Sequence, residues 1–182
     1  MNKGLTLLLS CLLLACGTDY TPKPSGFFRI DLPEKEYQKS TIDCPFSFEY
    51  PNYSIIEERK ENCWFDLHYP SFSAKLHMSY ISVGNQLNTH LENARELAYK
   101  HSKVAEAIRE QAYQNVDKKV YGMVYNYEGN TATAMQFYLT DSSQHFVRGA
   151  LYFNTQVTDS IAPVSAFLQD DLYRLIDSWE WE

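Results

Sequence analysis

The chain has 182 residues, with 23 acidic against 16 basic side chains and a formal net charge of −7 at pH 7. This acidic balance argues against binding to nucleic acid, which requires a basic patch, and against electrostatic attachment to an anionic membrane. The length suits one domain with a substantial core, and 14 tyrosines and 10 phenylalanines favour β-sheet.

The first 15 residues predict a secretory signal peptide. Lys3 supplies a positive charge, and the uncharged apolar stretch over residues 4–15 is shorter than a membrane-spanning helix requires. Cys11 and Cys16 each follow Leu-Leu and a small residue. Cleavage before Cys16 leaves an apolar stretch of normal length and a polar new N-terminus, so we expect Cys11 to be discarded.

The sequence Leu-Leu-Ala-Cys at residues 13–16 resembles a bacterial lipobox. The resemblance implies that Cys16 receives a diacylglycerol and that more than one acyl chain anchors the protein stably. The alternative is an ordinary cleaved signal with a free cysteine nearby. Residues 16–26 contain two prolines and predict an extended tether, and residues 27–182 predict a single domain.

Alternation of apolar and polar residues predicts strands, and three-to-four spacing predicts helices. We expect six strands, at residues 46–51, 63–70, 74–83, 119–129, 131–140 and 145–154. We expect two amphipathic helices, at residues 87–112, with a possible break near His101, and at residues 161–181. The predicted fold is α+β, an antiparallel sheet of about six strands whose one apolar face is covered by both helices. Its element order is similar to that of PsbP and Mog1 proteins.

Two cysteines of the predicted domain, Cys44 and Cys63, are candidates for a disulfide in an exported protein. Alternation carries both to the apolar side of strands that we expect to be neighbours. Two free thiols, or one buried thiol, are the alternative. No CxxC or HxxxH spacing indicates a zinc site.

The second face of the predicted sheet carries polar groups and a tryptophan. This face is either solvated or a docking face for another envelope protein, and the apolar arm at residues 26–32 could cover its tryptophan. A metal site built from Asp66, His68 and His77 is the least favoured interpretation. The candidate contact residues are Glu49, Trp64, Asp66, His68, His77 and Arg148.

No assembled catalytic set is evident, and we expect neither enzymatic activity nor a cofactor. Asp141, Ser142, Ser143 and His145 lie in one tight turn without a GxSxG elbow, so they indicate a hairpin turn instead of a hydrolase triad. His101 is either a hydrogen-bonded core histidine or a proton-linked contact.

Several segments resemble the gliding motility lipoprotein GldD family. They are KPSGFFRIDLPEKEY, CPFSFEYP, KLHMSY, LAYKHSKVAEAI, QFYLTDSSQHFVRGALYF and DSIAPVSAFLQDDLYRLI. The resemblance implies a non-enzymatic, lipid-anchored envelope protein of the gliding and type IX secretion apparatus, with other proteins of that apparatus as partners. We expect it to face the periplasm. The alternative is a periplasmic lipoprotein that binds a small ligand or peptide.

Overall fold

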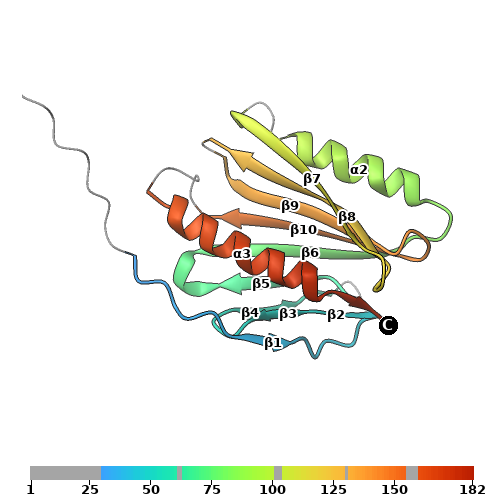
Figure 1. Cartoon of the computed structure of the whole chain (residues 1–182), viewed down its shortest axis with the longest axis horizontal. Helices are drawn as coiled ribbons and strands as arrows, with labels where there is room; N and C mark the ends of the chain where they lie inside the picture. The colour runs from blue at the N-terminus through green and yellow to red at the C-terminus, as the bar shows by residue number, and fades with distance from the viewer. Residues whose placement is uncertain (1–29, 61–62, 101–103, 130, 155–159) are drawn as a thin grey trace, which may run out of the picture.

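The computed structural model describes residues 30–60, 63–100, 104–129, 131–154 and 160–182 (Figure 1). The predictions for the signal peptide, Cys11, Cys16, the tether, the first residues of the apolar arm and His101 lie outside the described residues.

A seven-stranded antiparallel sheet forms the centre of the domain and confirms the α+β class. Its strand order is β4-β5-β6-β10-β9-β8-β7. In that order the strands are Ile55–Glu58, Phe65–Tyr69, Ala74–Ser82, His145–Phe153, Thr133–Thr140, Val120–Glu128 and Ala107–Asn115. The similarity in element order to PsbP and Mog1 stays a prediction.

The segment expected as a first sheet strand, residues 46–51, lies outside the large sheet. It is divided between β2 (Phe46–Ser47), which pairs with β11 (Glu180–Trp181), and β3 (Glu49–Pro51), which pairs with β1 (Tyr37–Lys39). Its aromatic rings stack on Trp179, which follows the last helix. This packing buries the segment against the C-terminal end of the domain, so its alternation does not come from membership of the large sheet.

The helices are α2 (Leu87–Tyr99) and α3 (Ala162–Ser178), and a short 3₁₀ helix, η2 (Pro70–Phe72), joins β5 to β6. The predicted continuation of the first helix to residue 112 is wrong, because Ala107–Asn115 forms strand β7. All nine residues of β7 pair with β8, and this long-range pairing overrides a local spacing that also suits a helix.

The helices cover opposite faces of the sheet, which corrects the prediction that both cover one face. Figure 1 shows α3 lying across one face. There it packs in the main core with Val124, Phe137 and Val147. The alternate positions Tyr125 and Phe146 pack with α2, through its Ala98 and Ala94 respectively. The second face therefore has its own apolar area over β8–β10, and α2 covers it.

A disulfide joins Cys44 to Cys63, with 5.6 Å between their Cα atoms. The predicted route is wrong, because neither cysteine lies in a strand and β2 pairs with β11 instead of β5. The bridge ties the segment before β2 to the connection between β4 and β5. The strand β4 itself was not predicted, because the sequence analysis placed no strand between residues 51 and 63.

The described part of the N-terminal arm lies against α3. Lys35 Nζ donates to the carbonyl oxygen of Phe167 at 2.9 Å, and Tyr37 donates its hydroxyl proton to Asp171 at 2.8 Å. Ile30 packs against the main core. From Ile30 onward the arm therefore lies on the face opposite Trp64, so this part of it does not provide the suggested cover for that tryptophan.

Candidate functional site

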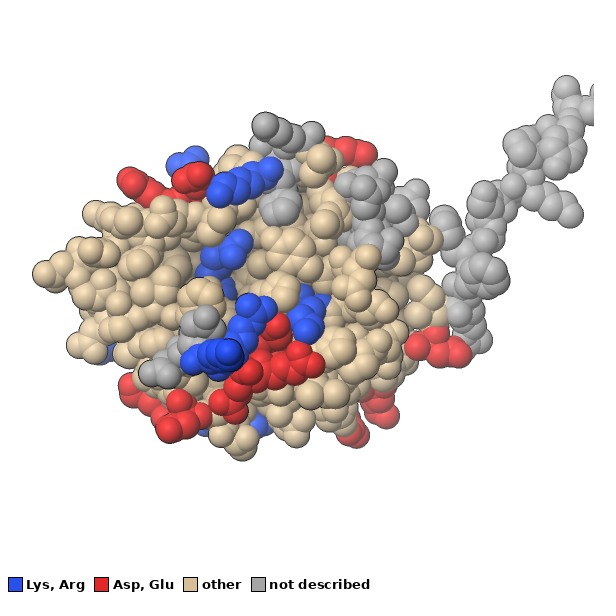
Figure 2. Space-filling model, turned by 180° about the vertical axis from the view of Figure 1, so that it is seen from behind, with Lys and Arg blue, Asp and Glu red and all other residues tan. Residues whose placement is uncertain are grey.

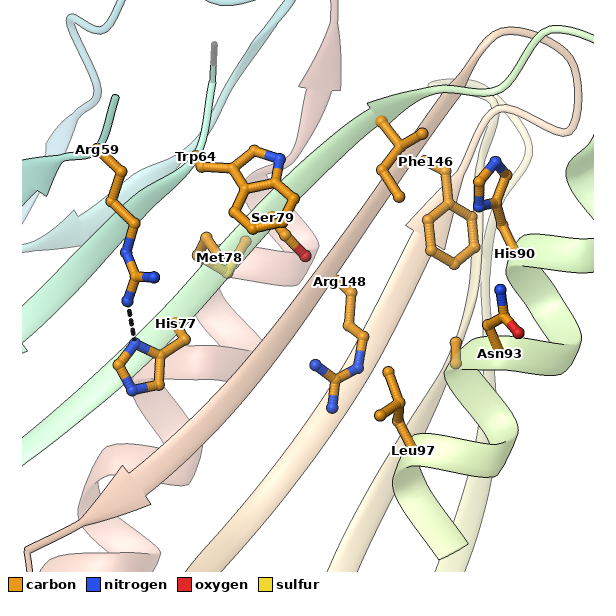
Figure 3. Close-up of a pocket in the computed structure, with 12 residues that line it drawn as sticks. Arg59, Trp64, His77, Met78, Ser79, His90, Asn93, Leu97, Phe146 and Arg148 are labelled. Atoms are coloured by element: carbon orange, nitrogen blue, oxygen red, sulfur yellow. Dashed lines mark hydrogen bonds between the residues drawn. The ribbon is translucent and has the colours of Figure 1, made fainter. Parts of the chain in front are cut away.

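A groove with a cavity of about 360 Å³ lies between α2 and the strands of the second face (Figure 3). It exists because α2 packs over β8–β10 and leaves the β4–β6 side of this face uncovered. From the strand side the groove is lined by Trp64, His77, Ser79, Ile81, Phe146 and Arg148. From the helix side it is lined by His90, Asn93, Ala94 and Leu97. Figure 2 views the molecule from this side and shows basic and acidic side chains gathered near the middle of the face.

Trp64 forms a fixed wall of this groove. Its indole N–H donates to the backbone carbonyl oxygen of Tyr80 at 2.8 Å, which holds the ring beside β6. The side chain is half-buried, so the tryptophan expected to be exposed already has part of its surface covered by its own domain. A large apolar ring with its polar atom satisfied is a suitable surface for a second apolar group.

Asp66 is a buried carboxylate beside the groove, and its charge is balanced locally. Arg59 Nη2 lies 2.7 Å from both carboxylate oxygens, and His77 Nδ1 lies 2.7 Å from Oδ1. Arg59 Nη2 is also 2.9 Å from His77 Nδ1 (Figure 3). Burial raises the pKa of the Asp66 carboxyl, but the hydrogen bonds from Arg59 and His77 outweigh it and lower the pKa below its ordinary value. Asp66 therefore stays ionised and fixes these two side chains.

Arg148 differs from Arg59 because its hydrogen-bond partner is neutral. Its Nη2 donates to Oε1 of Gln136 at 2.5 Å, and no ion pair to Arg148 occurs within the described ranges. Gln136 is buried, and its Nε2 has no hydrogen-bond partner in the described parts of the chain. A positive charge without a matching carboxylate thus faces the groove (Figure 3).

A model of the gliding motility lipoprotein GldD family matches residues 17–181. The chain belongs to this family. The match confirms the resemblance seen in the sequence and covers the described domain as far as Trp181, including the groove. No curated protein matches the chain. Among the helices of the described residues, none is both long and apolar enough to span a membrane.

The groove of this GldD-family lipoprotein contains three of the predicted contact residues, Trp64, His77 and Arg148. Asp66 lies next to it through His77, whereas His68 lies 3.5 Å from Glu57 of β4. Glu49 does not belong to this face, which corrects the prediction. It lies in β3 and accepts hydrogen bonds from Arg174 of α3, because its segment is not part of the large sheet.

The sequence analysis missed the helix side of the groove and Arg59. His90, Asn93 and Leu97 recur at helical spacing, so they share one side of α2. That spacing was a usable signal. Arg59 carried no such signal, because the sequence analysis assigned no strand to the segment before it, which forms β4.

The site offers binding groups but no assembled nucleophile. In the described chain, His77 Nδ1 lies within hydrogen-bond distance of Asp66 Oδ1 and Arg59 Nη2, and no hydroxyl or thiol bonds to it. Across the same residues, no group of three or more His, Cys, Asp or Glu side chains is placed to hold a metal ion. The turn after β9 has the predicted structure, since Asp141 accepts hydrogen bonds from Ser143 Oγ and from the backbone N–H groups that follow it.

Proposed function

We propose that this GldD-family protein is a non-enzymatic, lipid-anchored component of the gliding and type IX secretion apparatus. It works without a cofactor, through contacts with other envelope proteins of that apparatus. The family match supports the process. The observation that carries the contact role is the groove, where Arg148 faces an apolar surface without an acidic partner among the described residues. Charge and apolar area exposed together are typical of a binding surface.

Loss of the groove's charge should stop gliding without removing the protein. We expect cells whose only copy carries Arg148→Gln to lose spreading and type IX secretion, with normal abundance of the protein in the membrane fraction. Arg174→Gln is the matched control, because Arg174 lies on α3 and bonds Glu49 away from the groove. Normal gliding with Arg148→Gln at wild-type abundance would contradict a contact role for this groove.

We also propose that the lipid on Cys16 holds the domain at a membrane with the groove in the periplasm. An acidic domain has little electrostatic attraction to anionic lipid, so the acyl chains supply the attachment. Protease added to intact cells should leave the protein uncut, and permeabilised cells should lose it. Digestion in intact cells would place the domain outside and refute this orientation.

The second candidate function is a periplasmic lipoprotein that binds a small ligand or peptide. The cavity of about 360 Å³ favours it, because this lies within the usual range of about 300–1,000 Å³ for ligand pockets. A small molecule that co-purifies with the protein and is lost with Arg148→Gln would support this function over a protein contact.

A further inference from the structure

We propose that the groove binds an extended segment of a partner protein, with a carboxylate of that segment on Arg148 and a bulky apolar side chain against Trp64 and Phe146. This inference rests on the proposed function, because it names the chemistry of the partner that the groove contacts.

A carboxylate on the partner segment is expected because Arg148 forms no ion pair with the described residues of its own chain. A guanidinium has N–H donors in a planar fork that matches a carboxylate, and the hydrogen bond of Arg148 to Gln136 Oε1 leaves other donors for a ligand. Arg59, the other arginine of the groove, is already committed to Asp66 through both carboxylate oxygens. Arg148 has no ion pair in the described part of the chain, although the protein carries a net charge of −7. An incoming carboxylate would complete at Arg148 the pairing that Asp66 completes at Arg59.

A bulky apolar side chain on the partner segment is expected because a rigid aromatic surface lies beside Arg148. Trp64 is held by its hydrogen bond to Tyr80, and the Phe146 ring stacks on Tyr138 with 5.4 Å between centroids. Leu97 of α2 is 36% exposed at the groove and can cover a bound side chain. Preorganised aromatic walls bind an apolar group with little loss of side-chain freedom.

A peptide suits this groove better than an acyl chain because polar groups stand on both walls. Ser79 of β6 and Asn93 of α2 line it from opposite sides (Figure 3), and neither side chain makes a hydrogen bond to another described residue. A peptide backbone carries N–H and C=O groups that can pair with such side chains. An acyl chain would cover them without pairing, and this has a cost in free energy.

The test uses the full-length protein, purified from membranes in detergent, and two matched libraries of short displayed peptides. One library has a central Asp or Glu flanked by Phe, Leu or Tyr, and the other replaces the acid by Asn or Gln. We expect selection to enrich the acidic library. For the best peptide, we expect Arg148→Gln to raise the dissociation constant about 10- to 100-fold, the usual range for losing a charge-assisted hydrogen bond. Arg174→Gln should leave it unchanged.

A second substitution keeps the test valid if Arg148→Gln disturbs folding. Replacing the acid of the selected peptide by its amide leaves the protein intact and should weaken binding by a similar factor. Equal selection from both libraries would overturn the proposal. Binding of phosphatidylglycerol vesicles that depends on Arg148, in place of peptide binding, would overturn it in favour of a lipid ligand.

The outcomes separate this inference from the proposed function. If cells with Arg148→Gln lose gliding but neither library yields a binder, the contact role survives and the acidic-peptide chemistry is wrong. If acidic peptides bind through Arg148 but those cells glide normally, the peptide site stands and its role in gliding is refuted.

Discussion

Substitution of Asp171 by Ala should strongly destabilise the packing of the N-terminal segments against α3. The carboxylate is buried and accepts the hydroxyl protons of Tyr37 at 2.8 Å and Tyr53 at 2.5 Å, while Lys35 Nζ lies 3.2 Å away. Burial and the bond to Asp171 raise the pKa of both tyrosines well above the ordinary value, so both remain donors at alkaline pH. One carboxylate therefore joins α3 to the N-terminal arm and to the segment after β3.

The expected loss follows from the number of groups left without a partner. Each hydrogen bond to a charged group contributes about 1.5–3 kcal/mol, but bonds that share one carboxylate are not additive. Removing one partner of a buried ionic cluster costs about 3–5 kcal/mol, and we expect Asp171→Ala to fall in this range. Tyr53→Phe alone should cost about 1.5–3 kcal/mol.

The measurement is urea unfolding of the full-length protein and of the two single variants and their double variant. Asp170→Ala is the matched control, because its side chain is 74% exposed beside the same lysine, whereas that of Asp171 is fully buried. An exposed pair contributes at most about 1 kcal/mol. If Asp171→Ala costs no more than Asp170→Ala, or if its effect simply adds to that of Tyr53→Phe, the reasoning is wrong.

Three further predictions concern the disulfide, a turn and the lipid anchor. Cys63→Ser should lower the free energy of unfolding by about 3 kcal/mol, because the bridge closes a loop with a sequence separation of 19. Reduction of the wild-type protein should lower its free energy of unfolding by the same amount, and urea unfolding checks this. Burial raises the pKa of the Asp141 carboxyl, but hydrogen bonds from Ser143 and the following backbone N–H groups outweigh it and hold the pKa at about 2. The unfolded value is about 3.9, so this contribution is present above pH 4 and is lost as the pH falls towards 2. Unfolding curves of Asp141→Asn should therefore show a weaker dependence on pH in this interval, and an unchanged slope would exclude the turn as its source. Cys16→Ala should abolish labelling by radioactive palmitate while Cys11→Ala retains it, and the reverse result would show that Cys11 is the lipidated residue.

Local patterns in the sequence determined much of the large sheet. Alternation located β5, β6, β8, β9 and β10, since a half-buried strand must present apolar side chains on every second residue. The Asp141 turn was equally predictable, because its carboxylate bonds the backbone within four residues. The family resemblance was also present in the sequence, since it depends on residue order alone.

Elements whose partners are remote in sequence were not predictable. The residues of β7 are spaced to suit either a helix or an edge strand, and only pairing with β8 selects the strand. Phe46 and Phe48 alternate like sheet residues but stack on Trp179, more than a hundred positions away. The second face was interpreted as polar, yet Tyr125 and Tyr138 on it pack against α2.

The groove belongs to the tertiary structure. The sequence placed Trp64, His77 and Arg148 on one face by alternation, but it contained no information on which charge is neutralised. Asp66 of β5 contacts Arg59, which follows β4, and His77 of β6. Arg148 of β10 contacts the neutral Gln136 of β9 instead. Electrostatic balance depends on distances through space between side chains on different elements, and those distances exist only once the strands have paired and α2 has packed.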